Sequence, residues 1–180
     1  MMKKEHEVMM VKRIRQFLQN IRYGYQAVDR KFISGYLNQE EIRLFEKLQK
    51  SEQIHAILVA KSVLEELGSS EDRSFIIAVL LHDIGKIQRP LNIAEKSLAV
   101  IIDKLFQKSS PFEKRSFMKS YRLHGQRGED LLRENHVFTE EPVFYEVVGT
   151  HHENDDQIAE RKNGRLEFYH NLLKKHDERY

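Results

Sequence analysis

The sequence predicts an all-α protein of one domain, and three observations support that class. Its 180 residues are about the length of one domain, and no linker or internal repeat divides them. The chain contains only 3 prolines and 8 glycines, so few positions interrupt a helix. Apolar residues recur at intervals of three and four, and they do not alternate with polar residues for long enough to indicate a strand. We therefore expect a single core covered by helices.

The first two helices are predicted from an apolar stripe and from a capping motif. The stripe consists of Met10, Ile14, Phe17, Leu18 and Ile21. Its spacing is that of an amphipathic helix. Farther along, Asn38 precedes Glu41 by three residues, which is the spacing of a capping box at the start of a helix. The apolar face of that second helix is expected to carry Ile42, Phe45 and Leu48.

Two further helices follow, and the second contains the most apolar segment of the chain. Ser51 is expected to cap the first of them, which stops at Gly68 because glycine commonly ends helices. Ser70, followed by two acidic residues, is expected to open the second. An unbroken apolar run over residues 75–81 predicts that this helix is deeply buried. The helix is expected to end near Gly85.

The second half of the chain is predicted to contain four helices and one loop. An apolar stripe begins at Asn92, a shorter helix begins around His124, and Thr139 is expected to cap the next one. The highly charged stretch 154–165 predicts a loop. The apolar face of the last helix is expected to carry Leu166, Tyr169 and Leu173.

Charge and composition exclude several functional classes. The chain has 30 basic and 28 acidic residues, without the basic excess that is typical of a nucleic-acid binder. Its longest apolar run is far shorter than the roughly 20 residues that cross a bilayer, and its charged N-terminus lacks an apolar signal segment. The absence of cysteine excludes disulfides, thiolate metal sites and a cysteine nucleophile. We therefore expect a cytoplasmic protein with neither a nucleic-acid nor a membrane partner.

Polar residues that interrupt the apolar helix faces indicate a metal site. The strongest candidates are His55, His82, Asp83, His151 and Asp177. His151 follows Val147 and Val148 by four and three residues, so it is expected to point toward the core. Asp177 follows Leu173 by four residues and is expected to point inward as well. An unpaired inward carboxylate is costly, so a cation among these side chains is the simplest explanation.

Asp83 is the natural residue to connect two cations. A carboxylate has two oxygens and can bridge two metal ions, whereas an imidazole nitrogen binds only one. Lys86 follows the helix end, where it either places an ammonium over a bound phosphate or is a solvated surface lysine. Arg127, one turn after His124, is a weaker candidate for binding phosphate. The chain has no P-loop and no G-x-S-x-G motif, so water activated by a metal is the nucleophile that remains.

The polar motifs together resemble the HD superfamily of metal-dependent phosphohydrolases. Residues 81–86, Leu-His-Asp-Ile-Gly-Lys, are similar to the signature of that family. His55 lies where the family has its first histidine, and Asp177 resembles its final aspartate. The segments 124–128 and 151–153 resemble the branch that binds two metals. The resemblance spans roughly residues 51–177, but no Gly-Tyr-Pro segment follows His152, which argues against hydrolysis of cyclic di-GMP.

The resemblance implies a helical HD-domain bundle with a metal site between the helices. The implied metal ligands are His55, His82, Asp83, His124, His151, His152 and Asp177. Asp83 and Lys86 are the implied catalytic residues, and Lys86 and Arg127 the implied substrate contacts. Imidazole and carboxylate ligands suit one or two divalent ions of iron, manganese, zinc or nickel. Residues 51–180 would form the HD domain, with helices of residues 1–50 packed on its core.

The implied function is hydrolysis of a nucleotide or another phosphorylated small molecule by metal-activated water. The alternative is a degenerate HD module that senses a nucleotide or a metal without turnover. Among single residues, His152 either binds metal or orients its neighbour, and Asp155 or Asp156 could replace Asp177 as the last carboxylate. His170 and His176 are expected to lie behind the ligands or at the surface. Oligomeric state is left open.

Overall fold

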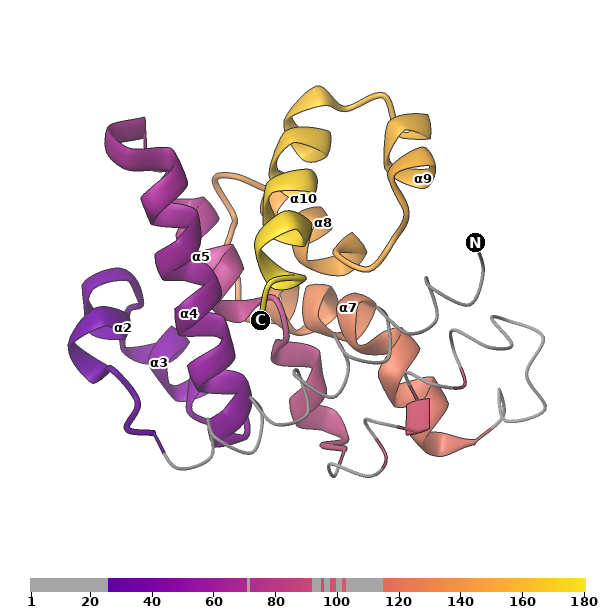
Figure 1. The fold of residues 1–180 in the computed structure, drawn as a ribbon, viewed down its shortest axis with the longest axis horizontal. Coiled ribbons are helices and arrows are strands. Elements are labelled where there is room, and N and C mark those ends of the chain that lie inside the picture. The colour runs from indigo at the N-terminus through magenta and orange to yellow at the C-terminus, as the bar shows by residue number, and fades with distance from the viewer. Residues whose placement is uncertain (1–25, 71, 92–94, 96–97, 100–101, 103–114) are drawn as a thin grey trace, which may run out of the picture.

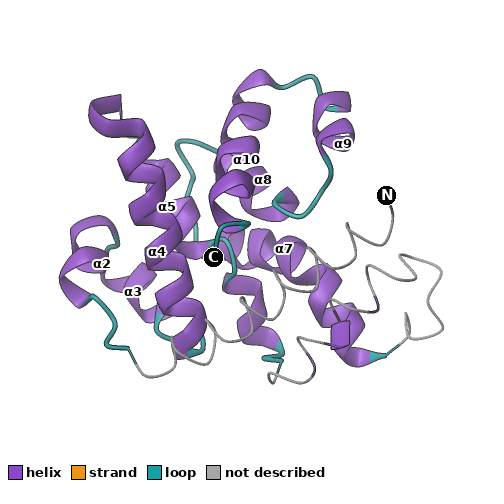
Figure 2. Cartoon of the chain, viewed as in Figure 1, coloured by secondary structure: helices purple, strands orange, loops and turns teal. Residues whose placement is uncertain are grey.

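The computed structural model describes residues 26–180 except 71, 92–94, 96–97, 100–101 and 103–114. Every regular element among these residues is a helix, which confirms the all-α class (Figures 1 and 2). The α-helices are α2 (Arg30–Tyr36), α3 (Gln39–Phe45), α4 (Lys50–Leu67), α5 (Arg73–Leu81), α7 (Ser116–Glu134), α8 (Val143–Thr150), α9 (Asp155–Glu160) and α10 (Gly164–Asp177). Two 3₁₀ helices, η1 (Gly68–Ser70) and η2 (Ile84–Gln88), flank α5.

Some of the predicted features lie beyond this part of the chain. The helix predicted over residues 10–21 is outside the described residues, as is most of the stripe that begins at Asn92. None of the described helices is long and apolar enough to cross a membrane.

The predicted capping box at the start of α3 is confirmed. The Asn38 side chain accepts a hydrogen bond from the Glu41 backbone N–H at 2.9 Å, and the Glu41 carboxylate accepts one from the Asn38 N–H at 2.8 Å. These two bonds satisfy donors that a helix start otherwise leaves without partners. The helix ends at Phe45, so Leu48 lies beyond it, although its side chain is still buried in the core.

The ends of α4 and α5 correct three sequence predictions and confirm one. Gly68 ends α4 as predicted, with a φ of +55° that glycine adopts readily. Ser51 does not cap α4, because the helix already begins at Lys50. Asp72, not Ser70, caps α5 by accepting a hydrogen bond from the backbone N–H of Phe75. α5 ends at Leu81 rather than near Gly85, which lies within η2.

The C-terminal half contains more helix than predicted. α7 begins at Ser116 rather than around His124, and its first turn buries Met118. Pro142, not Thr139, occupies the N-cap position of α8. The stretch predicted to be a loop contains α9, which opens with a capping box formed by Asn154 and Gln157. The prediction failed because α9 buries one residue, Ile158, and so shows no apolar period in the sequence.

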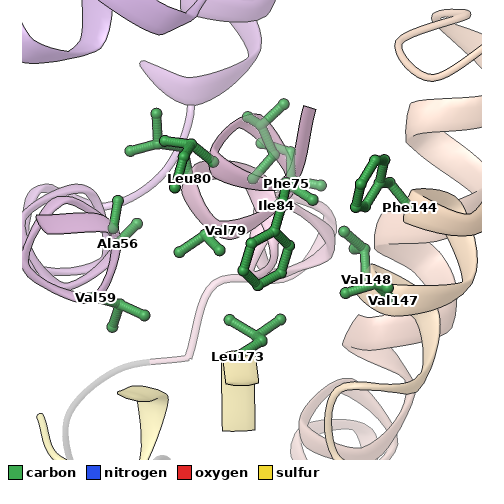
Figure 3. Packing of buried hydrophobic residues seen from close by; sticks show 14 of the residues in the cluster. Ala56, Val59, Phe75, Val79, Leu80, Ile84, Phe144, Val147, Val148 and Leu173 are labelled. Atoms are coloured by element: carbon green, nitrogen blue, oxygen red, sulfur yellow. The ribbon is translucent and has the colours of Figure 1, made fainter. Parts of the chain in front are cut away.

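The core is centred on α5, whose apolar residues are buried except for Ile77, which is partly buried. Phe75, Val79 and Leu80 are fully buried, as the unbroken apolar run predicted. Figure 3 shows this helix between residues of α4, such as Ala56, and residues of α8, such as Val148. α10 packs on both α4 and α8, and α2 and α3 contribute buried side chains to the same cluster. The C-terminal end of α5 is therefore held inside the helical assembly.

Candidate metal centre

All seven of the predicted metal ligands meet where several helices end. His82 and His151 occupy the C-cap positions of α5 and α8, and Asp177 is the last residue of α10. The side chains form two groups, and within each group one ligand atom per residue lies within 4.8 Å of the others. One group contains Asp83, His124, His151 and His152, and the other contains His55, His82 and Asp177.

Glycines allow the backbones that carry these residues to approach closely. A Cβ atom on Gly85 in η2 would lie 2.0 Å from the backbone oxygen of His124 and 2.6 Å from the backbone nitrogen of Gly128 in α7. A Cβ on Gly125 would lie 2.6 Å from the Gly149 oxygen in α8. Gly125 and Gly128 both lie inside α7, so they allow close helix approach rather than shape a turn. These contacts fix Asp83 relative to His124 and His151.

Three of the histidines are oriented by the same hydrogen bond. The Nδ1 atoms of His82 and His151 each lie 2.7 Å from the carbonyl oxygen three residues earlier, and the Nδ1 atom of His124 lies 2.5 Å from the corresponding oxygen. Because a carbonyl only accepts, Nδ1 donates in each case and Nε2 is left to face the site. The Nε2 atoms of His82 and His151 are buried without a hydrogen-bond partner. Histidines held in this way are typical metal ligands, so the donor set fits a cation.

The two oxygens of Asp83 face different groups of ligands. Oδ1 lies 3.3 Å from Nε2 of His124 and 3.8 Å from Nε2 of His151. Oδ2 lies 3.4 Å from Nε2 of His82 and 2.5 Å from the ammonium of Lys86. A carboxylate that bridges two ions requires this arrangement, with one oxygen toward each ion.

Asp177 completes the second group from the other side. Its Oδ1 lies 2.7 Å from Nε2 of His55 and 3.5 Å from Nε2 of His82. Its side chain is 20% exposed, whereas that of Asp83 is 2% exposed. Neither of the alternatives, Asp155 and Asp156, belongs to a metal-binding group: Asp155 pairs with Lys174 at 2.5 Å, and Asp156 is exposed.

The expectation that the inward carboxylates are unpaired without a cation is wrong. Burial opposes ionisation of Asp83, but Lys86, His82 and the other histidines outweigh it and hold its pKa well below the usual value. Burial likewise opposes ionisation of Asp177, and His55 and His82 lower its pKa well below the usual value. Both side chains are therefore carboxylates at neutral pH.

This environment shifts the pKa values of two site histidines in opposite directions. Burial lowers the pKa of His82, but Asp83 and Asp177 outweigh it and raise that pKa to about 10. A cation that binds Nε2 of His82 must therefore displace a proton. Burial lowers the pKa of His124, which keeps its imidazole neutral and able to bind metal without losing a proton. The Nε2 atom of His152, an exposed residue, lies 2.8 Å from Nε2 of His124.

Residues beside the ligands have structural roles that the sequence did not indicate. Glu153 pairs with Arg161 through both carboxylate oxygens, at 2.9 and 3.0 Å, and so holds the loop after His152 against the end of α9. His176 is fully buried and hydrogen-bonds Ser62 at 2.7 Å and Glu66 at 2.9 Å, both in α4. It is therefore not at the surface, one of the two places predicted for it, and it anchors α10 to α4 next to Asp177.

Four other residues lie on the elements that carry the ligands or next to them. His170 is fully buried, and burial together with nearby Lys174 lowers its pKa to about 4. Arg127 is half-buried on α7, three residues after His124. Lys86 has a 30% exposed side chain and lies 3.2 Å from the carboxylate of Glu52. The sequence pattern did not indicate a role for Glu52, although this residue precedes His55 by three positions on α4.

Comparison with known proteins gives one match. A family model described as HD domain matches residues 53–169, more than half of the chain. The match includes His55, both residues of the His82–Asp83 pair, and the histidines at 124, 151 and 152, and it ends before Asp177. No curated protein and no solved structure matches the chain.

Proposed function

The chain belongs to the HD-domain family, and from that premise we propose that it is a metal-dependent phosphohydrolase. Its substrate is a phosphorylated small molecule, with a nucleotide as the first candidate. The observation that carries the proposal is the position of Asp83, whose two oxygens face two separate groups of metal-binding side chains. The buried Nε2 atoms of His82 and His151, which have no hydrogen-bond partner, support the same conclusion.

The two groups would hold two ions that share Asp83. His55, His82, Asp83 and Asp177 would bind one, and His124, His151, His152 and Asp83 the other. Mixed nitrogen and oxygen ligands suit iron, manganese, zinc or nickel. Ions bound in this way would supply a hydroxide at neutral pH and neutralise charge on the phosphoryl oxygens.

The protein itself would bind and orient the phosphoryl group at the exposed edge of the site. Lys86 carries the positive charge at that edge, and its ammonium would donate a hydrogen bond to a phosphoryl oxygen. Arg127 is a second candidate contact, from α7. The buried side of the site is closed by α5 and α8, so substrate would enter past His55, Lys86 and Asp177, which are partly exposed.

Purified protein should carry about two transition-metal ions per chain if both proposed sites are filled, and about one if a single site is filled. Elemental analysis after growth with iron and manganese measures the metal content. A screen of mono-, di- and cyclic nucleotides with each metal then separates hydrolysis from binding alone. If the protein contained no metal under any growth condition, the proposal would be contradicted. If it bound a nucleotide without hydrolysing it, the alternative of a nucleotide-sensing HD module would be favoured.

Replacing both His124 and His151 by alanine should remove about half of the bound metal, because both belong to the same proposed site. Most of the hydrolytic activity should disappear, while helix content measured by circular dichroism stays unchanged. Gln126→Ala, an exposed position on α7, is the control and should keep both metal and activity. Full metal retention in the double variant would indicate a site for a single ion.

A further inference from the structure

A buried glutamate lies at the edge of the metal centre. Glu52 lies in the first turn of α4, three residues before His55, and its side chain is 7% exposed. Its Oε2 atom lies 3.2 Å from the ammonium of Lys86 in η2. Burying a carboxylate is costly, so a buried carboxylate that faces a charged partner indicates a defined electrostatic role.

The ammonium of Lys86 lies between two carboxylates that belong to different parts of the fold. Asp83 approaches it to 2.5 Å from the end of α5, and Glu52 approaches it to 3.2 Å from α4. Asp83 and Lys86 are only three residues apart, whereas Glu52 and Lys86 are 34 residues apart. Glu52 therefore connects Lys86 to α4, whereas His82 and Asp83 lie at the end of α5.

Once cations are bound, Asp83 and Glu52 would no longer attract the Lys86 ammonium equally. Oδ2 of Asp83 also faces His82, so this oxygen is the one that a cation in the second group would use. A cation at that oxygen repels the ammonium and weakens its attraction to Asp83. Glu52 belongs to neither metal-binding group, so a cation in those groups would leave its contact with Lys86 in place.

We propose, on the basis of the function proposed above, that Glu52 is a positioning residue that holds the Lys86 ammonium toward a bound phosphoryl group. Glu52 keeps Lys86 at the exposed edge of the site when cations occupy the carboxylate oxygens of Asp83. In this role Glu52 acts through the ammonium and is neither a metal ligand nor a substrate contact.

A simple electrostatic effect and this positioning role predict opposite results for Glu52→Gln. Glutamine removes a negative charge near a site for an anion, so electrostatics alone would strengthen phosphate binding. Loss of positioning would instead weaken it, because Lys86 is no longer held where phosphate meets it. The sign of the change therefore separates the two explanations.

The test measures binding of inorganic phosphate by calorimetry, with manganese at saturation and metal content checked by elemental analysis. Glu52→Gln and Lys86→Met should each weaken phosphate binding about tenfold, since each removes one charge-assisted contact. In the Lys86→Met background, Glu52→Gln should cause no further weakening. Glu52→Asp should recover part of the affinity, and thermal unfolding confirms that each variant is folded.

Other outcomes would overturn either the positioning role of Glu52 or the proposed function itself. If Glu52→Gln binds phosphate as tightly as wild type or more tightly, or if it weakens binding equally with and without Lys86, the positioning role is wrong. If Glu52→Gln loses manganese at saturation, Glu52 is itself a metal ligand. If metal-loaded wild type neither binds phosphate nor cleaves a phosphoester, the proposed function fails, and this inference fails with it.

Discussion

Asp83→Asn should abolish metal-dependent phosphoester hydrolysis and remove most of the bound metal. Asparagine keeps the size of the side chain and one oxygen but loses the charge that both groups of ligands share. Each oxygen of Asp83 faces different histidines, so one substitution damages both proposed ion sites. Elemental analysis and hydrolysis of a substrate that the wild type cleaves measure the two losses.

The same substitution should also destabilise the metal-free protein. Asp83 ionises with a lowered pKa, so its charge stabilises the fold at neutral pH, and this stabilisation disappears only when acid protonates the carboxylate. We expect the free energy of unfolding to fall by about 3 kcal/mol, the lower end for breaking a buried ion pair, because Glu52 still pairs with Lys86. The pairing of Asp83 with Lys86 and His82, which the sequence pattern did not indicate, is the reason for this loss.

A matched control separates these effects from a general loss of acidic charge. Asp156→Asn changes an exposed carboxylate on α9 and should leave metal content, activity and melting temperature near wild type. Near-normal turnover in Asp83→Asn would show that Asp83 is not shared between ions. Metal loss in Asp156→Asn would instead place the last carboxylate ligand in α9.

Gly85→Ala should disrupt the site without changing any ligand. The new Cβ would lie 2.0 Å from the backbone oxygen of His124, and backbone atoms cannot turn aside as a flexible side chain can. η2 must therefore move away from α7, which separates Asp83 from His124. We expect a loss of at least about 3 kcal/mol, the upper end for overpacking, and a melting temperature lower by about 6 to 12 °C. Bound metal should fall with it.

Gly35→Ala is the control for this substitution. Gly35 lies in α2, and a Cβ there would have no atom within 4 Å, so alanine should be neutral or slightly stabilising. Differential scanning calorimetry of both variants measures the contrast. Equal melting temperatures for Gly85→Ala and Gly35→Ala would show that the close backbone contact at η2 is not a constraint.

Sequence pattern predicts this fold well where local chemistry decides the structure. The capping box at Asn38 and the stop at Gly68 depend on nearby residues and are confirmed. The predicted burial of residues 75–81 is confirmed for all of them except Ile77, which is partly buried. Four helix starts were wrong. Those at Ser51, Ser70 and Thr139 failed because a serine or threonine caps a helix only when backbone geometry allows it, and α7 begins at Ser116 rather than around His124. α9 was missed because its single buried residue, Ile158, gives no visible apolar period.

The sequence also predicts the ligands of the candidate site but not the contacts that support them. The sequence identifies side chains whose types and spacing suit a metal, and the structure brings all seven together. It does not indicate that Lys86 pairs with Glu52, or that His176 fastens α10 to α4, because those partners come from distant segments. Contacts of this kind depend on how helices pack, and a single sequence does not encode them in any local pattern.

Three helices end at the site, and their direction affects the ions that it attracts. α5 and α8 stop at His82 and His151, and α10 stops at Asp177. The aligned peptide dipoles of a helix place roughly half a negative charge at its C-terminal end. The backbone therefore adds a negative potential to that of the carboxylates, before any side chain binds an ion. Variants that lose single ligands should still concentrate divalent cations weakly, and added salt should reduce that residual attraction.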